Sequence, residues 1–166
     1  MKRLLIILAL ALCLAGCGIY SFTGTSIDPD VHTICIPTFE YKAMRVNPSL
    51  ANDLSEEIRN RFRRMTRLEQ VEMDGDLEII GEIVGYDVQA SAVTASEIAA
   101  QNRLTVSVKV TFNNNKHPEE SFANKSFSAY ADYDSENSLD AVESTLCAEI
   151  IDKIVEDVFN ATVAQW

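Results

Sequence analysis

The ten residues Arg103–Phe112 constrain the fold more strongly than any other part of this 166-residue chain. In RLTVSVKVTF every second side chain is apolar, which is the pattern of a β-strand with one buried and one exposed face. The apolar set is Leu104, Val106, Val108, Val110 and Phe112, and the polar set is Arg103, Thr105, Ser107, Lys109 and Thr111. A sheet built on this strand is therefore expected to be covered on one face and polar on the other.

Two amphipathic helices are available to cover the apolar face. The first follows Asn47, a plausible N-cap, and Pro48, and its apolar residues recur at steps of three or four: Leu50, Leu54, Ile58, Phe62 and Met65. The second begins at Asn137 or Ser138 and runs to about Ala164. Its second half carries two apolar rows, which indicate either a deeply buried core helix or one row that meets a partner: Ile150/Ile154/Val158 and Ile151/Val155/Phe159.

Four further segments have strand patterns, and they are Val31–Pro37, Leu68–Met73, Leu77–Gln89 and Ser121–Tyr133. We interpret Thr38–Val46 as a loop. Gly81 and Gly85, inside one of these strands, indicate a bulge or a close backbone approach. The order of elements predicts an α+β, two-layer sandwich, with two helices packed on one face of a mixed, mainly antiparallel sheet of four to five strands.

The N-terminus reads as a targeting segment. Lys2 and Arg3 precede the uncharged run Leu4–Leu14, which is roughly half of the ~20 residues needed to cross a bilayer. The run ends in Leu14-Ala15-Gly16-Cys17, which resembles the bacterial lipobox. The alternative is an ordinary signal peptide in which Cys17 is accidental.

The lipobox interpretation predicts cleavage between Gly16 and Cys17, with a diacylglycerol on the Cys17 thiol and an acyl chain on its new amino group. Several acyl chains give a stable anchor, because each buried methylene contributes about 0.8 kcal/mol. The predicted organisation is a lipoprotein signal peptide over 1–16, a lipidated tether over 17–30 and a single α+β domain over 31–166.

Composition and motifs exclude several function classes. The net charge of −11 argues against a nucleic-acid binder, since phosphate backbones are held by an excess of Lys and Arg. The chain has no Gly-x-Ser-x-Gly elbow, phosphate-binding glycine loop or His-Glu-x-x-His pair. His32 and His117 lie 85 positions apart, which gives a zinc site little support. We therefore expect no catalytic residue, no metal and no cofactor.

Two cysteines remain in the mature chain once Cys13 is removed and Cys17 is acylated. Cys35 falls in a predicted strand and Cys147 in a predicted helix. In an oxidising compartment the two could form one disulfide, provided that their Cα atoms lie within about 7 Å. The alternative is two small buried thiols.

One basic cluster contrasts with the overall acidity. RNRFRRMTR holds five arginines in nine residues: Arg59, Arg61, Arg63, Arg64 and Arg67. Guanidinium groups suit phosphates and carboxylates, so this cluster is a candidate contact for lipopolysaccharide (LPS) or for an acidic partner. The alternative is a solvated helix end whose cations complement the helix dipole.

The whole mature chain resembles the LPS-assembly lipoproteins of the LptE type, in the variant found in Bacteroidetes-like sequences. The resemblance rests on CGIYSFTG after the lipobox, on Pro29, the strand Val31–Ile36 and Phe39, and on DLEIIGEIVGYDV, NRLTVSVKVTF and AYADYDS. Apart from the lipobox these motifs are loose, so the order of elements carries most of the likeness.

The resemblance implies an outer-membrane lipoprotein on the periplasmic side, without enzymatic activity or cofactor. Its implied partners are a large outer-membrane β-barrel LPS translocon, LPS, and the membrane through the lipid anchor. The protein would plug and help assemble that barrel and assist LPS insertion into the outer leaflet. An alternative is a periplasmic lipoprotein that serves as scaffold or pilot for another envelope assembly machine, and a lipid-anchored hydrolase ranks third.

Overall fold

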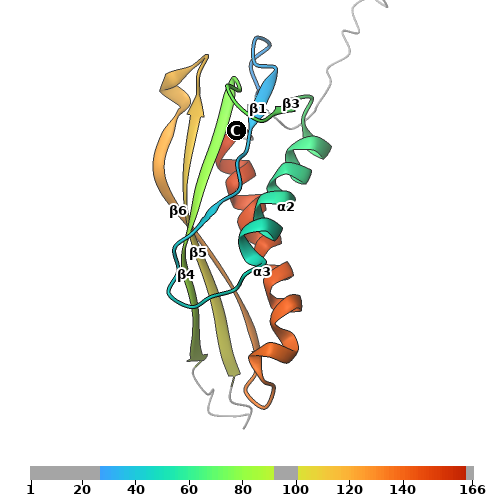
Figure 1. The fold of residues 1–166 in the computed structure, drawn as a ribbon, viewed down its shortest axis with the longest axis vertical. Helices are drawn as coiled ribbons and strands as arrows, with labels where there is room; N and C mark the ends of the chain where they lie inside the picture. Colours follow the sequence, from blue (N-terminus) through green and yellow to red (C-terminus); the bar gives the residue numbers. More distant parts are fainter. Residues whose placement is uncertain (1–26, 92–100, 164–166) are drawn as a thin grey trace, which may run out of the picture.

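The computed structural model describes residues 27–91 and 101–163 (Figure 1). The predicted signal peptide, the cleavage site, Cys17 and most of the tether lie outside the described residues. The elements are β1 (Thr33–Cys35), β2 (Glu40–Tyr41), α2 (Leu50–Met65), β3 (Glu69–Val71), β4 (Leu77–Ser91), β5 (Gln101–Asn114), the 3-10 turn η1 (Pro118–Glu120), β6 (Phe122–Asp134) and α3 (Leu139–Thr162). Within the described residues, no helix is both long and apolar enough to span a membrane.

The six strands form one sheet in the order β3-β1-β4-β5-β6, with β2 paired to β4. Strands β4, β5 and β6 are long antiparallel neighbours. Strand β1 runs parallel to both β3 and β4, and β2 runs parallel to β4. The two-layer α+β architecture is confirmed. The expectation of a mainly antiparallel sheet of four to five strands is wrong, because the sheet is mixed and has six strands.

The parallel pairing of β1 with β3 has a simple cause. After β1 and β2, helix α2 returns the chain to the end of the sheet where β1 began, so β3 enters the sheet in the same direction as β1. The predicted loop Thr38–Val46 is also corrected, since it contains β2. This two-residue strand is held by β4 pairing and by the hydrogen bond from Lys42 N to Ile83 O (2.8 Å).

Both helices cover the same face of the sheet (Figure 1). Every second residue of β5 from Leu104 to Phe112 is buried beneath them, as the alternation predicts. The two apolar rows of α3 are both buried, so α3 is a core helix. Helix α2 packs on α3 through an edge-to-face contact between Phe62 and Phe159, whose ring centroids lie 5.1 Å apart.

The opposite face of the sheet carries no helix among the described residues. Its side chains from β5 are polar, and Ile80 of β4 and Tyr130 of β6 are exposed beside them. Arg103 makes two hydrogen bonds to the Asp132 carboxylate (2.7 and 2.9 Å) and stacks 3.7 Å above the Tyr130 ring. Ser107 and Ser128 exchange a hydroxyl hydrogen bond across β5 and β6. The polar face predicted for β5 is therefore confirmed, and its Arg103 is paired with Asp132 on the neighbouring strand.

Candidate functional site

The candidate site is a pocket of about 530 Å³ between the start of the described chain and the end of α2. It exists because β1 and β3 are parallel neighbours, so the residues that precede each strand lie side by side; Glu69 N donates to His32 O across this junction (2.9 Å). The lining residues are Ile27, Asp28, Pro29, Val31, His32, Arg64, Met65, Thr66, Arg67 and Leu68. The pocket therefore combines apolar side chains with two guanidinium groups.

Thr66 ends α2 at the edge of this pocket. Its backbone is extended (φ −129°, ψ 172°), which stops the helix after Met65. Its hydroxyl donates to Phe62 O (2.7 Å) and accepts from Leu68 N (3.3 Å). These bonds fix the turn into β3, with Arg64 before it and Arg67 after it.

The opposite wall is fixed by Asp76. Its Oδ2 accepts hydrogen bonds from His32 N (2.9 Å) and Thr33 N (3.1 Å), and Lys116 Nζ lies 3.3 Å from its Oδ1. The bond from His32 N is the largest of the causes that lower the pKa of Asp76 to about 2. The carboxylate is thus ionised at neutral pH and holds the backbone of the pocket wall in place.

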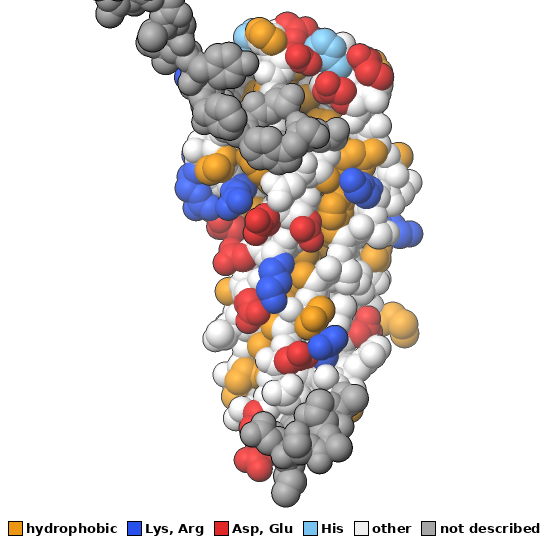
Figure 2. All heavy atoms as spheres, turned by 180° about the vertical axis from the view of Figure 1, so that it is seen from behind, with side chains coloured by type: hydrophobic (Ala, Val, Ile, Leu, Met, Phe, Trp, Pro, Cys, Tyr) orange, Lys and Arg blue, Asp and Glu red, His pale blue; other side chains and the backbone are white. Residues whose placement is uncertain are grey.

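The two pocket arginines differ in how free they are. Arg64 Nη2 donates to Glu57 Oε1 (2.6 Å), and its side chain is 59% exposed. Arg67 is exposed, and among the described residues no side chain pairs with it. Figure 2 shows basic side chains gathered on the left flank, toward the upper end where α2 finishes. A rim of two solvent-facing guanidinium groups over an apolar lining suits an anionic amphipathic ligand.

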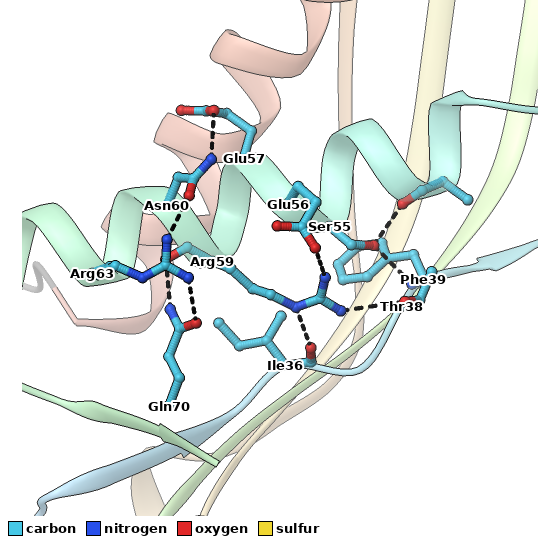
Figure 3. A network of polar contacts seen from close by, with 11 residues as sticks. Ile36, Thr38, Phe39, Ser55, Glu56, Glu57, Arg59, Asn60, Arg63 and Gln70 are labelled. Carbon is cyan, nitrogen blue, oxygen red and sulfur yellow. Dashed lines mark hydrogen bonds and ion pairs between the residues drawn. The ribbon is translucent and has the colours of Figure 1, made fainter. Parts of the chain in front are cut away.

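Arg59 has a structural role rather than a place in the pocket. Its Nε donates to Ile36 O (2.9 Å), and its two terminal nitrogens reach Glu56 (2.5 Å) and Thr38 (3.3 Å) (Figure 3). These bonds join α2 to the segment between β1 and β2. A guanidinium that is only 20% exposed and engaged in this way is not available to a ligand.

Arg61 and Arg63 also lie outside the pocket lining. The Arg61 guanidinium lies 5.5 Å from the Phe159 ring centroid of α3, and its Nε has no hydrogen-bond partner among the described residues. Arg63 donates to Asn60 Oδ1 (2.9 Å) and Gln70 Oε1 (3.1 Å) (Figure 3). The structure thus divides the predicted cluster, and it brings only Arg64 and Arg67 together at a pocket.

Both mature-chain cysteines are free and buried. The Cys35 thiol donates to Glu72 O (3.2 Å), whereas the Cys147 sulfur lies 3.8 Å from the Tyr86 hydroxyl and accepts a hydrogen bond from Asn47 Nδ2 (3.7 Å). Burial raises the pKa of both thiols. In this structure they correspond to the second alternative of the sequence analysis, two separate buried thiols.

The histidines are not brought together as ligands. His117 Nε2 contacts Asp30 (3.1 Å) and Asp28 (3.4 Å), which ties the turn after β5 to the start of the domain. The hydrogen bond to Asp30 is the main cause that raises the pKa of His117. Among residues 27–91 and 101–163, no group of three or more His, Cys, Asp or Glu side chains could hold a metal ion.

Sequence reasoning missed the apolar half of this pocket, which includes Ile27, Val31 and Leu68. On local pattern alone, Ile27 belongs to the predicted tether, and Val31 and Leu68 begin predicted strands. The usable signal was the strand–helix–strand order, because such a crossover predicts parallel strands and therefore adjacent approaches to them.

Fold and site together define a small two-layer α+β domain with one open sheet face and an arginine-rimmed pocket. The profile of the LptE family, described as lipopolysaccharide-assembly, matches residues 31–162, and the chain belongs to this family.

Two solved structures with TM-scores of 0.50 or more share the fold. A hypothetical protein from Chlamydia trachomatis is 11% identical, with a TM-score of 0.53 over 80% of this chain and 98% of that one. A putative neuraminyllactose-binding hemagglutinin homolog from Helicobacter pylori is 12% identical, with a TM-score of 0.50 over 85% and 88% of the two chains. A minor lipoprotein from Acinetobacter baumannii is 11% identical, with a TM-score of 0.48 over 78% and 91%. No curated protein matches the chain.

Proposed function

We propose that this protein is an outer-membrane lipoprotein, anchored through Cys17 on the periplasmic side, that plugs and helps assemble the β-barrel LPS translocon and assists LPS insertion into the outer leaflet. The observation that carries the proposal is the family match over residues 31–162. The lipobox at Leu14–Cys17 supports the anchor, because it supplies membrane attachment to a chain whose described helices do not span a bilayer.

The open sheet face supports the plug role. A barrel lumen is polar and water-filled, so a domain inserted in it should present polar side chains rather than a second hydrophobic layer. The uncovered face of β5 carries Thr105, Ser107 and Lys109, and the neighbouring strands add hydroxyl and charged groups. Such a surface can replace hydrogen bonds to water with hydrogen bonds to a polar lumen wall at little cost in free energy.

The pocket supports a direct contact with LPS. An LPS molecule joins phosphate-bearing sugars to acyl chains, and the pocket joins Arg64 and Arg67 to apolar side chains such as Met65 and Leu68. The guanidinium fork matches phosphate oxygens in a bidentate geometry. We therefore narrow the proposed LPS contacts of the arginine cluster to Arg64 and Arg67.

The plug role is tested by affinity purification of the full chain from detergent-solubilised outer membrane. We expect a large β-barrel protein to be recovered at equal stoichiometry, and we expect depletion of the chain to lower surface LPS. Recovery of a different envelope machine without a barrel would instead favour the scaffold or pilot role, and normal surface LPS after depletion would contradict the proposal.

The pocket is tested separately with purified LPS and the mature chain in detergent. The double variant Arg64→Gln and Arg67→Gln should weaken LPS binding by roughly tenfold, because two exposed ion pairs contribute about 1–2 kcal/mol together. Arg63→Gln is the matched control for the single variant Arg67→Gln, since each removes one positive charge near the end of α2 and only Arg67 lines the pocket. Equal losses in Arg63→Gln and Arg67→Gln would show that only general charge matters.

A further inference from the structure

The outer edge of β4 is open beyond Ile83. On this edge β1 pairs with Leu77 and Glu78, and β2 pairs with Glu82 and Ile83. Among residues 27–91 and 101–163, no strand pairs with the remainder of this edge, although β4 continues to Ser91. The edge lies at the end of the domain opposite the pocket, where the long β4, β5 and β6 strands extend past β2 (Figure 1).

The hydrogen-bond pattern shows which backbone groups face outward. On the other side of the sheet, Tyr130 O accepts from Lys153 Nζ (3.0 Å) and so points away from β5. Tyr130 is opposite Thr105, so the backbone N–H and C=O of Thr105 point away from β6 and toward β4. Thr105 is in turn opposite Asp87, so the backbone N–H and C=O of Asp87 point toward β5. Because backbone directions alternate along a strand, the N–H and C=O groups of Tyr86, Val88 and Ala90 face outward.

The outer edges of the three strands β4, β5 and β6 differ in how well they are protected from pairing with another chain. On the β6 edge, α3 places Lys153 against the Tyr130 carbonyl, and Asn124 adopts φ +53°, which disturbs the strand. Both are ways in which proteins keep an edge from pairing with another chain. Strand β4 has an irregularity of register between Ile83 and Gly85. Beyond it, from Tyr86 to Ala90, the described residues show neither a lysine on the backbone nor a positive φ, which leaves this edge competent to accept a strand.

The surroundings of the open edge add apolar contacts. The chain leaves β2 at Lys42, next to Ile83, and reaches Asn47, whose Nδ2 lies 3.4 Å from the Tyr86 hydroxyl. The intervening loop therefore runs beside the edge and carries two exposed apolar side chains, Met44 (102% exposed) and Val46 (76% exposed). Exposed apolar side chains beside unpaired backbone are typical of sites that bind extended peptides.

Charge selects the occupant. Glu40 and Glu82 are paired with Lys42, and Arg103, which lies opposite Gln89, is paired with Asp132. Asp87 has no ion pair among the described residues, so the segment Tyr86–Ala90 presents an unpaired negative charge. Asp134, Glu136 and Asp140 add negative charge at the same end of the domain, where Figure 2 shows acidic side chains beside the grey atoms. Pairing two copies through this edge would bring Asp87 toward Asp87 of the second copy, so a basic segment fits better than a second copy.

We propose that the open edge of β4 at Tyr86–Ala90 binds an extended, basic segment of a partner protein as an additional β-strand. The backbone of Tyr86, Val88 and Ala90 supplies the hydrogen bonds, and Asp87 contacts basic side chains on the open face of the sheet. Met44 and Val46 cover apolar side chains of the segment. This interaction is independent of the LPS contact at the opposite end of the domain.

The test uses the 15N-labelled mature chain in detergent and a capped nine-residue peptide, Lys-Val-Thr-Val-Lys-Val-Thr-Val-Lys. Amide hydrogen exchange of Tyr86, Val88 and Ala90 should be fast in the free chain and slow at least tenfold with the peptide. The exchange rates of the Asp87 and Gln89 amides should not fall with the peptide, because Asp87 already pairs with β5 and Gln89 has the same backbone direction.

Two variants sharpen the result. Ala90→Pro removes an outward N–H that β5 does not use and should weaken peptide binding at least fivefold while the fold is kept. Asp87→Asn should weaken it about two- to fivefold, as expected for an exposed ion pair, and it serves if the proline variant does not fold. A control peptide with Glu in place of Lys should bind more weakly than either variant binds the basic peptide.

Three results would overturn the proposal. Slow exchange of Tyr86, Val88 and Ala90 in the free chain at low concentration would show that another part of the chain already covers the edge. Slow exchange that develops only with protein concentration would show that the occupant is a second copy. Equal affinity for the basic and acidic peptides would remove the role of charge.

Discussion

Gly81 allows a sharp test of how the sheet packs. A Cβ atom at Gly81 would lie 2.0, 2.2 and 2.3 Å from three ring carbons of Phe39. The ring is only 3% exposed, and the Phe39 backbone is held by a hydrogen bond from its N–H to Ser55 Oγ (2.9 Å). The ring therefore cannot swing into solvent without breaking local structure, and Gly81→Ala should overpack this contact.

Gly85 provides the matched control on the same strand. A Cβ at Gly85 would lie 3.2 Å from the Cβ of Ser107 and 3.4 Å from the hydroxyl of Ser107 and the carboxylate of Asp87, all of which can give by a few tenths of an ångström. Gly→Ala also stabilises by about 0.4–1 kcal/mol where the backbone fits, because the unfolded chain loses freedom. Gly85→Ala should therefore change the free energy of unfolding by less than about 1 kcal/mol.

The expected difference follows from these distances. Overpacking in a filled core costs typically about 1–3 kcal/mol, so we expect Gly81→Ala to lower the free energy of unfolding by about 2 kcal/mol. With an m-value of about 2 kcal/mol/M in urea, the midpoint should fall by roughly 1 M. The assay is urea unfolding of the mature chain in a mild non-ionic detergent, followed by far-UV circular dichroism.

A double variant identifies the cause. Phe39→Leu removes the clashing ring atoms, so it should cost less in the Gly81→Ala background than in the wild type, with a coupling energy above about 0.5 kcal/mol. Equal midpoints for the Gly81→Ala and Gly85→Ala variants, or strict additivity with Phe39→Leu, would refute the reasoning.

Three further predictions follow from single contacts. Ser55→Ala should lower the free energy of unfolding by about 1–3 kcal/mol in urea, because it leaves the buried N–H of Phe39 without its acceptor; no change would mean that another group takes over. Since the hydrogen bond raises the pKa of His117 and lowers that of Asp30, the pair should stabilise fully between the ordinary pKa values of the two groups (3.8 and 6.5). The melting-temperature advantage of wild type over His117→Asn should therefore shrink as pH rises above 6.5 through the raised pKa of His117, and also as pH falls below 3.8; a constant difference from pH 5 to 9 would contradict this. Cys17→Ser should leave an unprocessed, non-acylated chain with unchanged circular dichroism, read by mass spectrometry, and normal acylation of the variant would exclude Cys17 as the attachment site.

The long elements could be predicted from the sequence because their patterns are determined by the core itself. β5 alternates from Arg103 to Phe112, and both helices repeat apolar residues along a face that is buried in the structure. The buried contact at Gly81 was likewise signalled by a glycine inside a strand. In each case a pattern of residues close together in the sequence predicts a single buried surface.

The short strands could not be predicted in this way. β2 has two residues, and its place depends on Ile83, which lies 42 positions beyond Tyr41 in the chain. The arginine cluster shows the same limit for the site. Its five side chains are close in sequence and similar in chemistry. Arg59 nevertheless donates a hydrogen bond to the carbonyl of Ile36, whereas Arg67 lines a pocket together with Ile27 and Val31. Which arginine is free depends on tertiary neighbours that no local pattern contains.

The two proposed surfaces also have a consistent geometry. In the proposed arrangement, with Cys17 as the lipid anchor, the predicted tether over 17–30 joins the described chain at Ile27, in the wall of the arginine-rimmed pocket. That arrangement puts the pocket, rather than the open edge of β4, on the side of the anchor and of the membrane's anionic lipids. The open edge of β4 lies at the opposite end of the domain, where an acidic surface is not repelled by those lipids (Figure 1). A protein that receives LPS at the membrane and a partner segment away from it needs this separation, because each ligand then meets the charge that attracts it.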